Sequence, residues 1–94
     1  MKRRVEISIL ARRDIARLSD FLSPKNPRAW KAAVAAISNR LRSLNQMSER
    51  GHFSPDGDLR EMFVRFGRAG YVIQYRTTPG EVFILRIFHS LEER

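Results

Sequence analysis

Three apolar runs follow one another in the second half of the chain, and they constrain the fold more than any other feature. They span residues 59–66, 71–77 and 82–89. Short glycine-containing segments, 67–70 and 78–81, separate them. Apolar runs of this length with short turns between them predict strands that pair as an antiparallel meander.

The beginning of the chain predicts one more strand. Val5, Ile7 and Ile9 alternate with the polar residues Glu6 and Ser8. This alternation has the period of two that is typical of a half-buried strand.

The next segment repeats its apolar residues every three or four positions, which predicts an amphipathic helix. The apolar stripe consists of Ile15, Leu18, Phe21 and Leu22. We expect Asp14 and Asp20 to face away from this stripe. The segment 23–27 ends the helix, because its prolines cannot continue one.

A second helix is predicted from Pro27 to just before Ser48. Asn26 is a favourable N-cap, and proline is well tolerated at the first helical position. The apolar positions that recur at helical spacing are Trp30, Ala33, Val34, Ile37, Leu41 and Leu44. Two amphipathic helices joined by a short turn predict a helical hairpin.

The predicted order is therefore β-α-α-β-β-β. This order indicates an α+β fold, in which the helical hairpin packs on a four-stranded, mainly antiparallel sheet. The 94 residues suffice for one core, so we expect a single domain over residues 1–94. Residues 48–58 lack periodicity and contain many turn formers, so they are predicted to form a loop.

The charge of the chain points to an anionic partner. The formal net charge is +8, and residues 1–47 contain 11 basic but only 3 acidic residues. Arginine outnumbers lysine by 15 to 3. Arginine makes planar, bidentate contacts to carboxylates and phosphates, so this bias favours recognition of an anion.

The sequence gives no indication of a cofactor, of a membrane span or of secretion. The chain has no cysteine and only two histidines, His52 and His89, so we expect no disulfide, no metal site and no cofactor. No apolar run approaches the length of about 18 residues that a membrane span requires. The apolar run after Met1–Arg4 is too short for a signal peptide, so we expect a cytoplasmic protein.

The last strand is apolar on both of its faces. Simple alternation places Phe83, Leu85 and Ile87 on one face. It places Val82, Ile84 and Phe88 on the other, together with Arg86. The strand at 59–66 likewise separates Met62, Val64 and Phe66 from Leu59 and Phe63. Two helices cover only one face of a sheet, so the second apolar face predicts a protein partner or self-association, the alternative being that the chain termini fold over it.

The chain resembles the RelE/ParE toxin superfamily, and the ParE branch is the closer match. The resemblance rests on the order of elements and on four sequence features: Asn26-Pro27, Leu59-Arg60-Glu61 after Gly57, Tyr71 with Tyr75, and the ending Ile84-Leu85-Arg86-Ile87-Phe88-His89. It implies the toxin of a type II toxin–antitoxin pair, bound by an antitoxin with an acidic C-terminal segment. It also implies a choice of target, since ParE-like members poison DNA gyrase and RelE-like members cut mRNA on the ribosome.

An RNase would need groups that move protons and cations that hold the phosphate. The candidates are Arg60, Arg65, Arg86 and His89, with Glu61 or Glu49 as a base. The chain departs from RelE-like RNases, because its last residues contain no tyrosine and no lysine follows Lys31. Alternation also separates Arg86 from His89, so we expect His89 to cap the core at the end of its strand.

We therefore expect a binding protein that inhibits DNA gyrase, with the mRNA endonuclease as the alternative. A family member that only forms a complex is a third reading. The expected contacts to the antitoxin or to the target are Arg60, Phe63, Arg65, Ile84, Arg86 and Phe88. Phe63, Tyr71, Tyr75 and Phe83 could also form a nucleic-acid stacking platform, but their spacing favours a place in the core.

Overall fold

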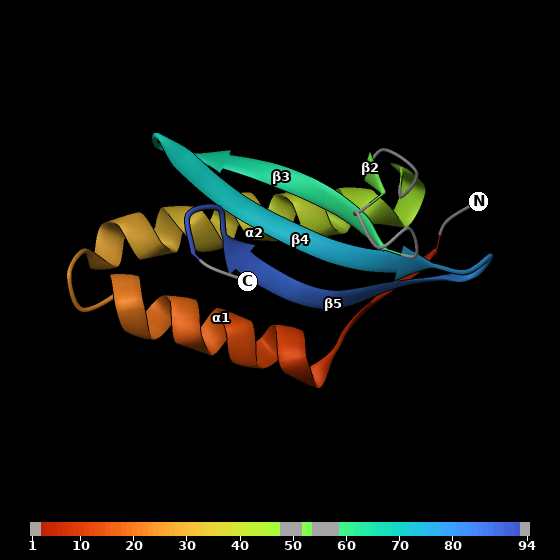
Figure 1. Ribbon diagram of the computed structural model, residues 1–94, viewed down its shortest axis with the longest axis horizontal. Coiled ribbons are helices and arrows are strands. Elements are labelled where there is room, and N and C mark those ends of the chain that lie inside the picture. Colours follow the sequence, from red (N-terminus) through yellow and green to blue (C-terminus); the bar gives the residue numbers. More distant parts are fainter. Residues whose placement is uncertain (1–2, 48–51, 54–58, 93–94) are drawn as a thin grey trace.

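The computed structural model describes residues 3–47, 52–53 and 59–92. Both helices lie on the same side of a twisted sheet (Figure 1). The elements are β1 (Arg4–Ile7), α1 (Ile9–Leu22), α2 (Pro27–Met47), β2 (His52–Phe53), β3 (Arg60–Phe66), β4 (Ala69–Thr77) and β5 (Glu81–His89). The predicted order of two helices and four long strands is confirmed, and so is the α+β class.

The strands lie in the order β1-β5-β4-β3-β2. β1 pairs with β5 in parallel, and the other pairs are antiparallel. The short β2 corrects the prediction of a continuous loop over 48–58, because His52 and Phe53 pair with β3. The rest of that loop, Glu49 included, is outside the described residues.

Side-chain caps fix where the two helices begin. The Ser8 hydroxyl accepts a hydrogen bond from the Ala11 N–H at 3.0 Å, so α1 starts at Ile9. The prediction that Ile9 belongs to the strand was wrong, and its side chain is 70% exposed. The predicted cap of α2 is confirmed, because Asn26 Oδ1 accepts from the Ala29 N–H at 3.0 Å.

The turn between β3 and β4 is tighter than predicted. It consists of Gly67 and Arg68, since β3 ends at Phe66 and β4 begins at Ala69. Gly67 has a φ of +62°, a conformation that side chains with a Cβ adopt only at a cost. A two-residue loop with this backbone suits the right-handed twist of a hairpin.

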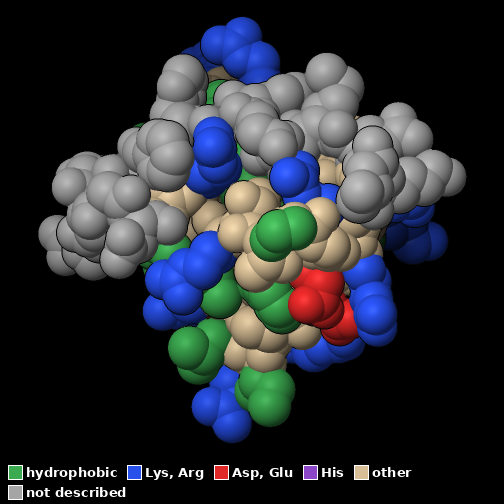
Figure 2. Space-filling view, turned by 90° about the vertical axis from the view of Figure 1, so that its right-hand side faces the viewer, with side chains coloured by type: hydrophobic (Ala, Val, Ile, Leu, Met, Phe, Trp, Pro, Cys, Tyr) green, Lys and Arg blue, Asp and Glu red, His purple; other side chains and the backbone are tan. Residues whose placement is uncertain are grey.

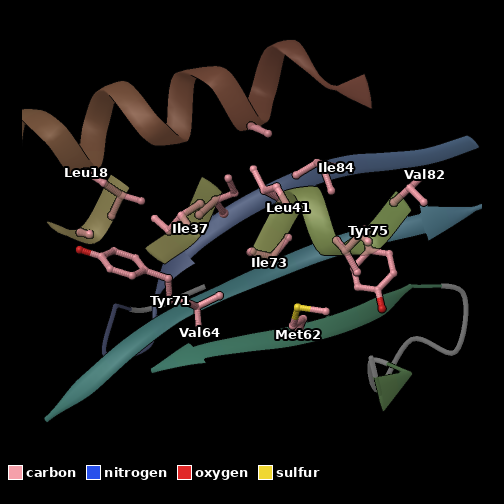
Figure 3. Packing of buried hydrophobic residues seen from close by; sticks show 14 residues of the cluster. Leu18, Ile37, Leu41, Met62, Val64, Tyr71, Ile73, Tyr75, Val82 and Ile84 are labelled. Carbon is pink, nitrogen blue, oxygen red and sulfur yellow. The ribbon is translucent and has the colours of Figure 1, made fainter. Parts of the chain in front are cut away.

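The core lies between the helices and the sheet (Figure 3). Its buried helical residues are Ala11, Leu18, Ala33, Ile37, Leu41 and Leu44. Its buried strand residues are Met62, Val64, Tyr71, Ile73, Tyr75, Val82, Ile84 and Ile87. Trp30 packs against this cluster as expected, although it is only partly buried. Phe21 does not, because its side chain is 67% exposed and lies 3.6 Å from Lys25 Nζ, measured to the ring centroid.

Strand β5 contains a bulge at Leu85. Gln74 pairs with Arg86 and Tyr75 pairs with Ile84, so Leu85 has no partner in the register. A bulge of this kind inserts one residue and shifts the alternation of the strand by one position.

The bulge decides which side chains of β5 face the helices. Ile84 and Ile87 both lie in the core, each with 0% exposure. Phe88 lies outside that cluster, on the side of Arg86. The predicted grouping of Ile84 with Phe88, and of Ile87 with Phe83, was therefore wrong, because simple alternation takes no account of a bulge.

Candidate functional site

The sheet face opposite the helices carries an apolar row across three strands. Phe63 pairs with Val72, and Val72 pairs with Phe88. Val72 and Phe88 are each 9% exposed, whereas Phe63 is 48% exposed. We call this side of the sheet the open face, because α2 lies behind the sheet and α1 lies along β5 (Figure 1). The predicted second apolar face is present on β3, where Met62 and Val64 turn toward the core.

A polar row lies next to the apolar one. Glu61, Gln74 and Arg86 are paired across β3, β4 and β5. The Gln74 side-chain amide donates to Glu61 Oε2 at 2.7 Å. The Arg86 guanidinium carbon lies 4.7 Å from the ring centroid of Phe88, a cation–π distance. The guanidinium thus stacks on one end of the apolar row.

Two further arginines of the open face are exposed to solvent. Arg65 and Arg76 follow the same alternation as Phe63 and Gln74, and both side chains are exposed. Within the residues that the structure describes, neither has an ion pair or a side-chain hydrogen bond. Their charge is therefore available to a ligand or a partner.

Arg86 is held by a buried carboxylate from α1. Asp14 accepts from Arg86 Nε at 2.8 Å and from Arg86 Nη2 at 3.0 Å, and it also accepts from the Ile87 N–H at 2.8 Å. Asp14 is 4% exposed and is buried along with Ala11 and Leu18 of the same helix, so the prediction that it faces away from the apolar stripe was wrong. Arg86 and Asp14 thus form the bidentate contact that is typical of a guanidinium with a carboxylate.

The pKa of Asp14 reflects opposing effects. Burial by itself would raise the pKa of this carboxyl group. The hydrogen bonds from Arg86 and from the Ile87 N–H, together with the charges of Arg86 and Arg17, hold the pKa below its usual value. The hydrogen bond to Asp14 raises the pKa of Arg86 in turn, so both groups are charged.

Helix α1 covers the part of the β5 edge that β1 does not reach. β1 ends at Ile7, opposite Ile84. Beyond that point, the Ser8 hydroxyl donates to the Leu85 carbonyl at 2.9 Å. The Arg17 guanidinium donates to the Ile87 carbonyl at 3.3 Å. These side chains satisfy backbone groups that an uncovered edge would leave open to another strand.

The four residues proposed for RNA cleavage do not meet in one place. Arg65 and Arg86 lie on the open face, in rows about 13 Å apart along the sheet. Arg60 pairs with Tyr75 and so lies on the helix side. His89 also lies on the helix side, where its ring meets Tyr71 edge-on with 5.5 Å between the centroids.

His89 is further occupied at the end of β5. Its Nδ1 accepts a hydrogen bond from the Leu91 N–H at 3.2 Å. Its own N–H donates to Glu92 at 2.9 Å. The contacts are those of a residue that closes a strand, and they agree with the position that the sequence indicated.

The predicted binding residues fall into two groups. The open face brings together Phe63, Arg65, Arg86 and Phe88. Arg60 and Ile84 are not among them, because Arg60 lies on the helix side and Ile84 is in the core.

Sequence reasoning missed Asp14, and the only local signal for it was its ion pair with Arg17, three residues later on the helix. The stacking platform is not formed, since Tyr71 and Tyr75 are 3% and 0% exposed inside the core.

A second feature is a groove of about 460 Å³ between β1 and α2. Its floor is apolar and its rim is basic. Its lining residues are Arg3, Arg4, Val5, Ile7, Ser38, Leu41, Arg42 and Asn45. Figure 2 views the molecule from the right-hand side of Figure 1 and shows lysine and arginine side chains distributed over this end.

Among the residues that the structure describes, no three His, Asp or Glu side chains gather as metal ligands would. No helix in the described ranges is long and apolar enough to cross a membrane.

Comparison with known proteins gives concordant matches. Residues 5–94 match the family model described as the ParE toxin of the type II toxin–antitoxin system parDE. Two proteins of Caulobacter vibrioides are similar over 90 residues: Toxin RelE3 at 42% identity, covering 96% of this chain and 97% of the relative, and Toxin RelE1 at 37%, covering 96% of each. A solved structure titled "Chromosomal ParDE TA system from P. aeruginosa" has the same fold, with a TM-score of 0.76 and 21% identity over 94% of this chain and 96% of the other.

Proposed function

Because the chain belongs to the ParE toxin family of type II toxin–antitoxin systems, within the RelE/ParE superfamily, we propose that it arrests growth by binding and inhibiting DNA gyrase. It acts as a binding protein and performs no chemistry of its own. A cognate antitoxin with an acidic C-terminal segment neutralises it in a toxin–antitoxin complex. It acts in the cytoplasm, where gyrase and its DNA are found.

The observation that supports this function is the separation of the groups that RNA cleavage would require. General acid–base catalysis needs the proton-transfer group within hydrogen-bond reach of the reacting atoms. Here His89 faces the core side while Arg65 and Arg86 face the opposite side of the same sheet. The charge of Arg86 is also offset by Asp14, which weakens its use as a phosphate ligand.

The groove between β1 and α2 is suited to bind the acidic segment of the proposed antitoxin. The N–H groups of Arg4 and Ser8 donate to the carbonyls of Gly80 and Ile84, on the β5 side, so the backbone groups of Val5 and Ile7 point to the outer edge. Strand addition at such an edge is a common mode of peptide recognition. Carboxylates of the added segment would meet Arg3 and Arg42 at the rim.

The alternative function, ribosome-dependent mRNA cleavage, is favoured only by the names of the two Caulobacter relatives. It would have to use Arg60, Arg65, Arg86 and His89 after a rearrangement that brings both sheet faces to one substrate.

Two assays of the purified toxin separate the functions. We expect it to inhibit supercoiling by purified gyrase and to leave ribosome-bound mRNA intact. The His89→Ala variant should inhibit supercoiling as the wild type does, since His89 is not a contact residue in this proposal. Cleavage of ribosome-bound mRNA that is lost in His89→Ala, without any effect on supercoiling, would establish the endonuclease instead.

A further inference from the structure

We infer that the toxin binds its target through one patch of the open face. The patch consists of Phe63, Arg65, Val72, Arg86 and Phe88. The inference rests on the proposed function in that the target is a protein that the toxin inhibits by binding. The matching surface of the target is an apolar side chain bordered by carboxylates. We call the five residues the Phe63 patch.

Phe63 has the properties of an anchor. Its side chain is 48% exposed, and its ring lies against the backbone of Gly70, in the space that a side chain at this position would occupy. A Cβ at Gly70 would lie 2.5 Å from Phe63 Cζ, so the ring rests on the glycine backbone. A large apolar group that is ordered before binding loses little conformational entropy when a partner covers it.

Two cationic side chains belong to the patch, and Asp14 offsets the charge of Arg86 but not that of Arg65. Arg65 has no ion pair among the described residues. Arg86 keeps a fixed position over Phe88 because Asp14 holds its guanidinium from the other side, and 38% of its side chain is still exposed. Aromatic residues and arginines fixed in this way are the residue types that dominate binding energy at protein interfaces.

The carboxylates of the same face favour a protein over a nucleic acid. Glu61 lies in the row beside Phe63, bonded to Gln74, and Glu6 lies at the β1 end, paired with Arg4 at 3.6 Å. A continuous phosphate backbone crossing the face would meet both carboxylates. A protein surface can direct its own carboxylates to Arg65 and its apolar side chain to Phe63.

The Phe63 patch is separate from the groove assigned to the antitoxin. The groove lies between β1 and α2, at the first strand of the sheet, while Phe63 and Arg65 are on β3. Substitutions in the patch should therefore weaken target binding and leave antitoxin binding unchanged.

The experiment uses Phe63→Ser and Arg65→Glu, each compared with a matched control. Phe21→Ser removes an even more exposed phenylalanine from α1, and Arg28→Glu reverses an exposed charge on α2. Growth arrest is measured on induction in cells, and inhibition of gyrase supercoiling and antitoxin binding are measured with the purified variants. We expect the patch variants to need at least about tenfold more toxin for the same effect, and the controls to stay within about twofold of the wild type. The melting temperature and antitoxin affinity of the patch variants should match those of the controls.

Growth arrest makes the inference testable whatever the target is. Patch variants that arrest growth as well as the controls do would overturn the inference, even if the wild type inhibits gyrase. Loss of arrest in the patch variants, combined with a wild type that leaves gyrase unaffected, would support the patch and refute the gyrase proposal. Binding of a fluorescent single-stranded RNA that Phe63→Ser abolishes would overturn the assignment to a protein partner.

Discussion

The carboxylate of Asp14 accepts hydrogen bonds from both Nε and Nη2 of Arg86, at 2.8 and 3.0 Å, although the two residues are 72 positions apart in the sequence. The same carboxylate accepts the Ile87 N–H at 2.8 Å, so one side chain satisfies both a guanidinium and the open edge of β5. α1 is thereby fixed to the sheet by polar contacts as well as by Leu18. Arg86 is held on the open face at the same time.

Replacing Asp14 by alanine should lower the free energy of unfolding by about 2–3 kcal/mol, because it leaves the buried Ile87 N–H without an acceptor and Arg86 without its counterion. Urea denaturation at neutral pH measures this change. Asp20→Ala is the matched control on the exposed side of the same helix, with an expected change below about 0.5 kcal/mol. Equal effects of the two substitutions would contradict the role assigned to Asp14.

Acid should destabilise the protein through Asp14. The folded-state pKa of Asp14 lies below the unfolded value of about 3.9, so its contribution is fully present above the unfolded pKa and is lost as the pH falls through the folded pKa. The free energy of unfolding, measured from neutral pH to below pH 3, should therefore decline more steeply in the wild type than in Asp14→Asn. Parallel curves for the two proteins would show that Asp14 titrates alike in both states.

Two glycines in turns should respond differently to alanine. Gly67 has a φ of +62°, so Gly67→Ala should cost about 1–2 kcal/mol of stability, even though no atom within 4 Å blocks the new methyl group. Gly80 has no positive φ and equally open surroundings, so Gly80→Ala should be neutral or slightly stabilising. Thermal unfolding of both variants measures the difference. A neutral Gly67→Ala would mean that the hairpin tolerates another turn type.

Because of the bulge in β5, alanine substitutions at two neighbouring positions should lower the stability by different amounts. Ile84 is fully buried, so Ile84→Ala should cost about 2–4 kcal/mol. Leu85 sits in the bulge and is only partly buried, so Leu85→Ala should cost clearly less. Denaturant unfolding of the two variants compares the costs directly. A larger loss at Leu85 would favour the uninterrupted alternation that the sequence predicted.

Local patterns were enough to predict most of the fold. The glycine turns, the Asn26-Pro27 start of α2 and its apolar stripe each depend on residues close together in sequence. For the same reason, the separation of Phe63 from Met62 and Val64 on β3 was predicted correctly. A strand without a bulge keeps its period of two, and the burial of β3 follows it.

The tertiary structure alone decided the faces of β5 and the role of Asp14. The bulge at Leu85 arises from the register between β4 and β5, which no pattern within β5 records. Asp14 was expected to face away from the apolar stripe, because a helix gives no sign of a guanidinium 72 positions away. The sequence by itself determined which segments are helices and strands, because hydrophobic periodicity acts locally. Only the packed structure determined which side chains share a surface, because that depends on contacts between distant segments.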